Sequence, residues 1–547
     1  MHPAGDDLGV RIVFRDAHIV VVDKPAGMLT MDRESGGQSG LDARLAAHLE
    51  KVAGFPFGRE RVAVLQRLDQ ETSGLLAFGL SEEGTRALAA QIEARTIEKD
   101  YVAGIVGRAP KGLLEDDLDE VDGRAKVVPK GRGKSARCRV ELMQSRQDRS
   151  LVRVRLETGR MHQIRIQLAS RGAPVAGDAL YGGVFAPRML LHAQRLSFGH
   201  PTEGRKTFES TLPPIFEAWL QGNVSEDVLL DAVLPLAMER RHSLLHNAET
   251  TAFRLVAEAA DGLPGVAVDV YGEHLVVHIH DAEVDEAHLL DRVHALGFRG
   301  VYLKRRPKKA QDLSAQDMTL HAPPLPVRGE PAADEFAVLE NGMPILVRLG
   351  DGMSTGLFLD QRTHRAKVRE RAKGKRVLNL FSYTCGFTLA AALGEAQSTL
   401  SVDASKRALD RGRANLAHAK VDGPQHRFIA EDAFDVLRRL HKRGEIFDLV
   451  CVDPPTFSTT KSSRWSSGAG WRDLFAQVAR VVAPEGVILA TSNDRRMHQG
   501  AFRDHARAGL VLASRESKRL VDSGAPLDFR DADAKEPLLK GLFVELR

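Results

Sequence analysis

The chain has 547 residues, of which 43% are hydrophobic and 27% charged, and its net charge is only +4. This composition is that of an ordinary folded protein, and at roughly 150 residues per domain the length predicts three or four domains. No apolar run reaches the ~18 residues of a membrane span, the N-terminus is unlike a signal peptide, and three unpaired cysteines argue against disulfides or a zinc site. We therefore expect a cytoplasmic protein without a metal.

The first third of the chain combines β-branched runs with turn residues and one well-marked helix. A serine at 81 followed by Glu82 and Glu83 is a typical helix start. The expected strands cover residues 12–14, 18–22, 62–65, 75–78, 101–106 and 151–156, and helices are expected at 81–93 and from 159 onward. Residues 1–222 thus predict a mixed, largely antiparallel α+β domain.

Six short motifs follow one another in this region. They are Asp23-Lys24-Pro25-Ala26-Gly27, Gln66-Arg67-Leu68-Asp69-Gln70-Glu71-Thr72-Ser73-Gly74, Lys99-Asp100-Tyr101, residues 158–165, residues 177–182 and Leu191-His192-Ala193. In this order they resemble the RluA-type pseudouridine synthases. The resemblance departs from the family at Gln66, where histidine is usual.

That resemblance implies an isomerase acting on uridine in RNA. Breaking the glycosidic bond and rejoining the ring through carbon requires a carboxylate that meets the sugar or the base, and the family assigns this role to Asp69. It implies that Arg165 keeps the carboxylate ionised and aimed. It further implies that Tyr101 stacks on the flipped base and can move a proton, and that Arg67 fills the gap left by the base. An inactive domain that only clamps RNA is the alternative.

Residues 223–325 predict a small α+β middle domain. Helices are expected at 225–245, kinked or divided at Pro235, and at 284–296, with strands at 251–256, 266–271, 274–280 and 300–303. His278 and His280 alternate with apolar residues, so we expect them on the solvent face of a strand and not as metal ligands. The cationic run from Lys304 through Arg305 and Arg306 to residue 309 is a candidate RNA contact, or else a solvated face.

Residues 326–547 predict a hairpin followed by a doubly wound, Rossmann-like α/β domain. Asn341-Gly342 marks the hairpin turn between 336–340 and 343–347. A charged helix at 363–372 precedes strands expected at 377–381, 399–402, 428–429, 447–452 and 487–491. Because ligands bind outside the carboxyl ends of such strands, residues 379–387 and 451–458 should face one pocket.

The cofactor of this pocket follows from its turn. Asp403 ends the second strand, and in such folds an acid at this position binds the two hydroxyls of a ribose. A nicotinamide-dependent enzyme would have the same acid. The first turn, however, has a single glycine, Gly386, and no pyrophosphate loop. The pattern favours S-adenosylmethionine, and a nicotinamide-dependent dehydrogenase is the rival interpretation.

Residues 249–547, including 261–265 of the middle segment, resemble the RlmI/RlmK-type 23S rRNA methyltransferases. The resemblance places Gln361 and Arg362 at the methionine end of the cofactor and Asp403 at its ribose. Its remaining assignments are Phe381, Ser382 and Tyr383 in the first turn, Asp432 with Ala433 at the adenine, Asp453 at the target base and Phe457 as a stacking residue. For Asp432, a helix N-cap is an equally good explanation.

The methylated atom can also be narrowed. Cytosine carbon-5 is not nucleophilic, so its methylation needs a cysteine that adds to the ring. The resemblance to RlmI-like enzymes places that cysteine just after the fifth strand, where residues 491–494 of this chain contain none. Cys385 and Cys451 are expected in the cofactor turn and inside a strand. The motifs instead resemble guanine-N7 enzymes, with adenine N6 as the alternative. The whole chain thus predicts a bifunctional RNA-modifying enzyme whose substrate is 23S rRNA or an assembling large ribosomal subunit.

Overall fold

The computed structural model describes most of the chain. The described residues are 10–31, 40–53, 62–121, 123–280, 284–306, 315–459, 464–529 and 537–547. No helix among them is long and apolar enough to cross a membrane, and no group of histidine, cysteine, aspartate or glutamate in these ranges could hold a metal ion.

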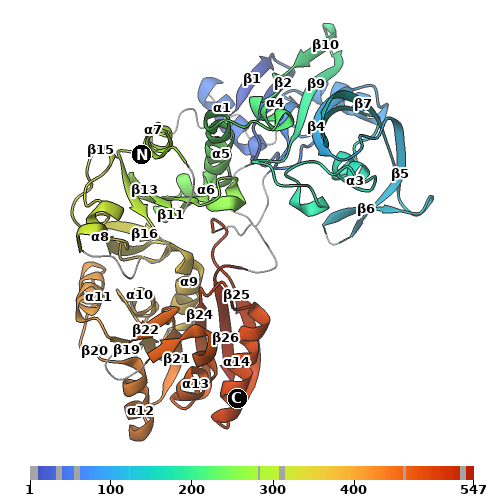
Figure 1. Ribbon diagram of the computed structural model, residues 1–547. Helices are drawn as coiled ribbons and strands as arrows, with labels where there is room; N and C mark the ends of the chain where they lie inside the picture. The colour runs from blue at the N-terminus through green and yellow to red at the C-terminus, as the bar shows by residue number, and fades with distance from the viewer. Residues whose placement is uncertain are drawn as a thin grey trace. The chain divides into compact units, whose positions relative to one another are not determined.

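The chain forms two compact units, whose elements Figure 1 labels. Unit 1 comprises Met1–His246, Asp261–Leu263 and Glu283–Gly297, and unit 2 comprises Asn247–Ala260, Pro264–Ala282 and Phe298–Arg547. The expected middle segment, 223–325, therefore contributes residues to both units. The division into three domains stays a prediction.

Unit 1 is built on a ten-stranded sheet in the order β1-β2-β3-β9-β4-β8-β7-β5-β6, with β10 paired to β9. All neighbours are antiparallel except β3 and β9, which run parallel, as expected for a mixed, largely antiparallel domain. The strands are β1 (Arg11–Arg15), β2 (Ile19–Lys24), β3 (Ser73–Gly79), β4 (Glu98–Val106), β5 (Gly112–Val121), β6 (Arg124–Val128), β7 (Lys134–Arg146), β8 (Arg149–Leu156), β9 (Leu191–His200) and β10 (Gly204–Glu209).

The helices of unit 1 are α1 (Leu41–Ala53), α2 (Glu82–Glu93), α3 (Gln163–Ala169), α4 (Pro214–Gln221), α5 (Glu226–Arg240), α6 (His242–Leu245) and α7 (Glu286–His294). Ser81 caps α2 as predicted, accepting a hydrogen bond from the Gly84 amide. Helix α5 continues through Pro235, whose ring faces solvent, instead of dividing there. The strand expected at 62–65 is reduced to a single bridge between Ala63 and Gly79.

Unit 2 begins with a five-stranded sheet and a hairpin. The strands are β11 (Ala252–Ala257), β12 (Val266–Tyr271), β13 (His274–Ile279), β14 (Gly300–Arg305) and β15 (Arg328–Gly329), then β16 (Phe336–Glu340) and β17 (Met343–Val347). Only β13 and β14 pair in parallel. The hairpin has the predicted bounds, and Asn341 and Gly342 both have positive φ, as its two-residue turn requires. Along the chain, a short helix, α8 (Ala315–His321), follows β14 and precedes β15.

The second sheet of unit 2 has seven strands in the order β20-β19-β18-β21-β24-β26-β25. They are β18 (Arg376–Leu380), β19 (Ser398–Asp403), β20 (His426–Ala430), β21 (Phe447–Val452), β24 (Val482–Ser492), β25 (Ser517–Ser523) and β26 (Lys540–Leu546). The first five strands in this order are parallel to one another. Strand β26 pairs antiparallel with β24, and β25 pairs antiparallel with β26 at the edge. The chain order reverses direction between β18 and β21, which is the switch point where ligands bind.

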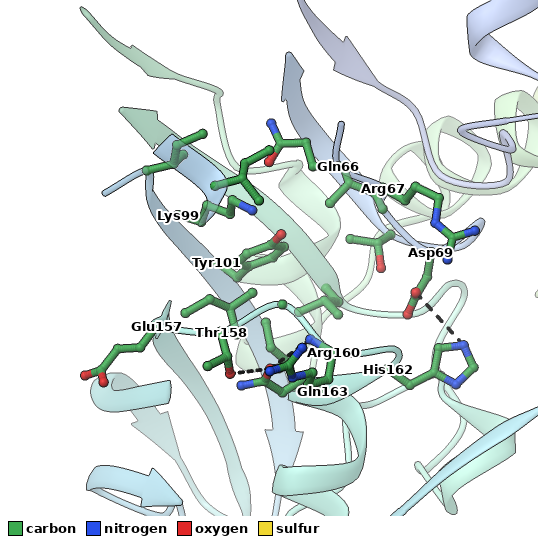
Figure 2. Close-up of a pocket in the computed structure, with 18 of the residues that line it drawn as sticks. Gln66, Arg67, Asp69, Lys99, Tyr101, Glu157, Thr158, Arg160, His162 and Gln163 are labelled. Carbon is green, nitrogen blue, oxygen red and sulfur yellow. Dashed lines mark hydrogen bonds and ion pairs between the residues drawn. The ribbon is translucent and has the colours of Figure 1, made fainter. Parts of the chain in front are cut away.

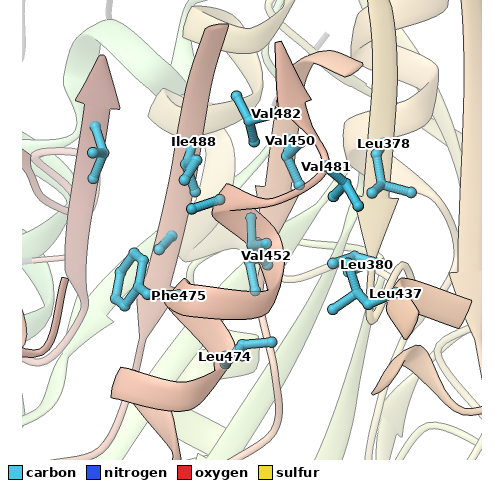
Figure 3. Packing of buried hydrophobic residues seen from close by; sticks show 14 of the residues in the cluster. Leu378, Leu380, Leu437, Val450, Val452, Leu474, Phe475, Val481, Val482 and Ile488 are labelled. Carbon is cyan, nitrogen blue, oxygen red and sulfur yellow. The ribbon is translucent and has the colours of Figure 1, made fainter. Parts of the chain in front are cut away.

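Helices cover both faces of this sheet. They are α9 (Arg362–Arg371), α10 (Gly386–Leu393), α11 (Lys406–His418), α12 (Ala433–Arg443), α13 (Ser467–Ala479) and α14 (Gln499–Leu512). Buried side chains of α12, α13 and α14 share one core with the sheet, shown in Figure 3, and those of α9, α10 and α11 share the other. The short strands β22 (Phe457–Thr459) and β23 (Arg464–Ser466) form a ribbon after β21. The predicted doubly wound fold is confirmed.

Candidate active sites

A cavity of about 300 Å³ in unit 1 contains the Asp69 loop. Its walls come from residues 65–72, from β4, from residues 156–165 and from Leu191, so four of the six sequence motifs meet there. Figure 2 shows Arg67 and Asp69 on the same loop, with His162 facing the Asp69 carboxylate and Tyr101 on the adjoining wall. The side chain of Asp69 is 27% exposed, so the carboxylate is open to a ligand.

Lys24 explains why the Asp69 loop holds its shape. Its buried ammonium donates hydrogen bonds to three carbonyl oxygens, those of Pro25 (3.0 Å), Met28 (2.8 Å) and Gln70 (3.1 Å), the last directly beside Asp69. Burial lowers the pKa of Lys24 to about 7. The first motif of the sequence therefore anchors the second.

Arg165 bridges two carboxylates. Its Nη1 donates to Asp69 Oδ2 at 3.1 Å, while Nε and Nη2 donate to the two oxygens of Asp178 at 2.6 and 2.8 Å. Burial acts to lower the pKa of Arg165, but the two carboxylates, Asp178 foremost, outweigh it and raise that pKa. The guanidinium is thus permanently charged and fixed in direction by Asp178, a partner that the sequence motifs contained without assigning it this role.

Tyr101 lies in the wall of the same cavity and is 8% exposed. Burial, and to a lesser degree the charge of Asp69, raises the pKa of its hydroxyl. The phenol therefore stays protonated. Its predicted stacking on the flipped base and its predicted proton transfer both stay predictions.

His162 is a neighbour of Asp69 that sequence reasoning did not single out. Its Nε2 lies 4.0 Å from Asp69 Oδ1, and its Nδ1 is 2.8 Å from the Tyr181 hydroxyl. Burial lowers the pKa of this imidazole, so it is neutral at pH 7. Its position inside the quoted motif 158–165 was the only available signal. Arg67 is exposed at the rim and Gln66 lines the cavity.

A second cavity, of about 320 Å³, lies at the carboxyl ends of β18, β19 and β21 in unit 2. The turn after β18 is tight, because Phe381, Tyr383 and Cys385 all have positive φ. Asp403, the last residue of β19, accepts a hydrogen bond from the Tyr383 amide at 2.8 Å. The predicted residues Phe381, Ser382, Tyr383 and Asp403 therefore come together, without any glycine loop that would bind a pyrophosphate.

Asp432 and Ala433 line this cavity where α12 begins. Asp432 is the N-cap of α12, accepting hydrogen bonds from the amides of Phe434 (2.9 Å) and Asp435 (3.4 Å). Capping and cofactor contact are compatible, because the residue both orients the helix and faces the cavity.

Asp453 ends β21 and is held by two side chains that carry no charge. Thr491 donates to Oδ1 at 2.5 Å, and Gln361 Nε2 donates to Oδ2 at 3.0 Å. Burial raises the pKa of Asp453 to about 7, and the nearby carboxylate of Asp360 contributes in the same direction. Sequence reasoning missed Thr491 and Asp360 as neighbours of this acid.

Arg362 does not occupy its predicted place. It is buried in an ion pair with Asp528 and is absent from the cavity walls among the described residues. The arginine that lines the cavity is Arg365, one helical turn later, which pairs with Glu340 at 2.6 Å. Asp528 is 166 positions away from Arg362, so local sequence contained no sign of the pair. The side chain of Phe457 lies outside the described part of the structure.

The described part of the cationic run, Lys304 to Arg306, starts at the end of β14 and is buried or half-buried. Lys304 is 1% exposed, and its ammonium donates to the carbonyls of Leu349 (2.9 Å) and Gly352, which corrects the expectation of an RNA contact at this residue. Arg305 donates to the Leu320 carbonyl at 2.6 Å. Arg306 donates to His278 Nδ1 at 3.2 Å and to the Met353 carbonyl at 3.0 Å.

His278 is also not where the strand pattern predicted it. It is 4% exposed, and its Nε2 lies 3.0 Å from Asp269 Oδ2. The alternation along β13 was misleading because both faces of this strand are covered. No metal ligand set surrounds it among the described residues.

Neither cysteine near the second cavity is available as a nucleophile. Cys385 and Cys451 are both fully buried. Burial raises the pKa of Cys385 to about 11 and also raises that of Cys451. Both thiols therefore remain protonated and inert at neutral pH.

A doubly wound sheet with an acid-ended second strand and no phosphate loop defines a class of nucleoside-cofactor enzymes. Residues 250–542 match the sequence profile of the S-adenosylmethionine-dependent methyltransferases. Residues 18–170 match that of the RNA pseudouridylate synthases. The chain belongs to the S-adenosylmethionine-dependent methyltransferase family, and it carries an N-terminal pseudouridine synthase domain of the RluA type.

Individual relatives agree with this assignment. The ribosomal RNA large subunit methyltransferase I of Aeromonas salmonicida is 32% identical over 57% of this chain and 79% of its own length. The protein of that name from Escherichia coli is 32% identical over 52% of this chain and 71% of its own length. A solved structure from Streptococcus mutans, described as a candidate S-adenosylmethionine-dependent methyltransferase, is 26% identical with a TM-score of 0.52, covering 64% of this chain and 87% of the other.

These matches establish S-adenosylmethionine as the cofactor of unit 2. The residues around the cavity fit it, since Asp403 can meet a ribose diol and no group is present for a pyrophosphate. The nicotinamide-dependent alternative is wrong.

Proposed function

We propose that this protein modifies large-subunit ribosomal RNA in two ways, isomerising a uridine to pseudouridine in unit 1 and methylating a base, guanine at N7, in unit 2. The observation that carries the proposal is the pair of separate acid-bearing cavities, each built from the motifs of its own enzyme family. The names of the relatives support ribosomal RNA of the large subunit as the substrate. Three free, buried cysteines are compatible with a reducing cytoplasm.

In unit 1 the uridine is flipped into the cavity, and Asp69 is the carboxylate that meets its sugar or base while the glycosidic bond breaks and the new carbon bond forms. Arg165 pairs with that carboxylate and orients it in the cavity. Tyr101 forms a wall against which the flipped ring stacks. Arg67, exposed at the rim, fills the gap left in the RNA.

In unit 2 the bound S-adenosylmethionine supplies an activated methyl group. Asp403 and the turn 381–386 hold the nucleoside end, and Gln361 and Thr491 fix Asp453 toward the base. N7 of guanine already presents a lone pair, so orientation is sufficient and no general base is needed. The inert cysteines support N7 over cytosine carbon-5, because the carbon reaction needs a thiolate to add to the ring.

The test is nucleoside mass spectrometry of ribosomal RNA from a deletion strain. We expect one pseudouridine and one 7-methylguanosine to be lost. Complementation with Asp69→Asn should restore only the methylated base, and complementation with a Ser382→Trp variant, which blocks the cofactor cavity, should restore only the pseudouridine. A missing N6-methyladenosine would assign adenine instead of guanine. Pseudouridine that persists in the deletion strain would mean that unit 1 only binds RNA, and pseudouridine restored in full by Asp69→Asn would mean that Asp69 is not the catalytic carboxylate.

A further inference from the structure

A cavity of about 620 Å³ adjoins the cofactor cavity within unit 2, and the proposed function leaves it without a ligand. Its walls come from β11 to β13, from Arg306, from residues 353–360 and from residues 493–495, 525–529 and 538–539. The two cavities share the wall residues Leu357, Phe358, Asp360, Asn493 and Leu539. A ligand in the larger cavity therefore reaches the reacting end of the smaller one.

Asp360 is the charged residue in the shared wall. It lies in the 3₁₀ helix η5 (Leu359–Gln361), next to Gln361, which holds Asp453. Burial raises its pKa, and within the described chain its carboxylate receives a hydrogen bond from no other residue. A carboxylate in this position is a free double acceptor that faces both cavities, and a ligand with two adjacent N–H donors would satisfy it.

The opposite wall carries a polar network centred on Asp269. Arg254 donates to both of its oxygens (2.8 and 3.0 Å), and His278 donates to it from Nε2. Burial lowers the pKa of His278 to about 4, so the ring is neutral and its Nδ1 accepts from Arg306. The charge of Arg254 thus neutralises that of Asp269. Among the described residues, Arg306 donates hydrogen bonds only to the neutral imidazole of His278 and to the Met353 carbonyl.

Arg306 consequently brings a positive charge to the cavity, and none of its hydrogen-bond partners in the described chain is a carboxylate. An anionic group of a ligand, such as a phosphate, is the natural partner for it. Between the two charged ends, Phe358 stands in the shared wall, and its residue surface is 51% exposed. An exposed aromatic ring beside a cofactor is a stacking platform for a base.

We infer that the larger cavity binds the target nucleotide, with its phosphate at Arg306, its base stacked on Phe358 and the N1–H and N2–H donors of guanine bound to Asp360. This inference rests on the proposed function and narrows it. Asp360 binds the Watson–Crick edge of the guanine, which leaves N7 free to accept the methyl group. Adenine offers that edge only one donor, N6–H, beside the acceptor N1, which a carboxylate repels.

The experiment is isothermal titration calorimetry of the full chain saturated with S-adenosylhomocysteine. The probes are 5′-GMP, 5′-IMP, which lacks only the N2 amine, guanosine, which lacks only the phosphate, and 5′-AMP. One hydrogen bond to a charged group is worth about 1.5–3 kcal/mol, so 5′-GMP should bind at least about 10-fold more tightly than 5′-IMP. Guanosine should bind more weakly than 5′-GMP, and 5′-AMP more weakly still.

Two variants and two controls locate the contacts. Asp360→Asn should give 5′-GMP and 5′-IMP equal affinity. Arg306→Ala should lower the affinity of 5′-GMP to that of guanosine and leave the affinity for S-adenosylhomocysteine unchanged. The controls Asp410→Asn and Arg299→Ala remove exposed charges outside both cavities and should bind every probe as the parent does.

Equal binding of 5′-GMP and 5′-IMP by the parent would overturn the inference, as would a preference for 5′-AMP. A loss of S-adenosylhomocysteine affinity in Asp360→Asn, with the 5′-GMP preference retained, would instead assign Asp360 to the cofactor. No binding of any nucleotide by a chain that still methylates guanine in ribosomal RNA would overturn this inference alone. Ribosomal RNA unchanged in the deletion strain would overturn the proposed function itself.

Discussion

The two principal carboxylates of this protein sit in opposite environments. Asp69 faces the guanidinium of Arg165 across 3.1 Å. Asp453 is hydrogen-bonded, among the described residues, only to a hydroxyl and an amide, and burial disfavours its charged form. The same side chain therefore lies beside a cation in one unit and titrates near neutrality in the other.

The titration of Asp453 predicts a pH effect on stability. Its pKa of about 7 in the folded protein exceeds the unfolded value of about 4, so between these values the native state holds a proton that the unfolded state has released, and stability falls as the pH rises. Asparagine does not titrate, so Asp453→Asn removes this loss of stability with rising pH. The melting temperature of the variant relative to the parent should rise by roughly 2–4 °C between pH 5 and pH 8. A difference that shrinks with pH would contradict this prediction, and Asp410→Asn is the control.

Arg165 predicts an effect on activity that a purely structural residue would not have. Lysine cannot bridge Asp69 and Asp178 at once, because it lacks the planar fork of donors. Arg165→Lys should slow pseudouridine formation by about 10- to 100-fold, the value of one charge-assisted hydrogen bond. Single-turnover rates of the variant and the parent will show the loss. Arg171→Lys, at the Asp116 ion pair outside the cavity, should leave the rate unchanged.

At the scale of elements, a close backbone contact between β3 and β9 fixes the path of the chain after the Asp69 loop. Gly74 lies in the parallel pairing of β3 with β9, its φ is +115°, and a Cβ there would lie 2.2 Å from the Ala193 carbonyl oxygen. The geometry of the chain after Asp69 therefore depends on a residue without a side chain. The strand predicted just before this loop, at 62–65, fails because the residues pair only once with β3.

Gly74→Ala should consequently destabilise unit 1 by about 4 kcal/mol or more, at the upper end of single substitutions, and abolish pseudouridine formation. Gly204→Ala is the matched control, because Gly204 also has positive φ but a Cβ there meets nothing within 4 Å. The control should cost only about 1 kcal/mol, the strain of a left-handed residue. Urea unfolding of both variants provides the comparison, and equal costs would refute the role of the backbone contact.

At the scale of the whole molecule, two compact units each contain one candidate active site with all of its residues. Among the described residues, the walls of each cavity come from its own unit. The chain passes between the units at residues 246–247, 260–261, 263–264, 282–283 and 297–298, so the middle segment contributes to both.

This organisation predicts that a ligand of one site stabilises only its own unit. S-adenosylhomocysteine at 100 times its dissociation constant adds about 2.7 kcal/mol to the state that binds it. Hydrogen exchange followed by mass spectrometry should therefore show slower exchange in β18, β19 and β21, with β3 and β4 unchanged. Protection that extends equally to β3 and β4 would show that the units respond as one body.

The sequence by itself determined the families, the fold classes and most of the residues at each site, because these depend on short motifs and on strand ends whose geometry is local. The hairpin at Asn341-Gly342 and the acid that ends β19 are of this kind. Only the tertiary structure decided which charges are already paired. It bound Arg362 to Asp528, buried Lys304 and His278, and left Asp360 facing both cavities. Such pairings join residues far apart in the chain, and local patterns contain no record of the distance between them.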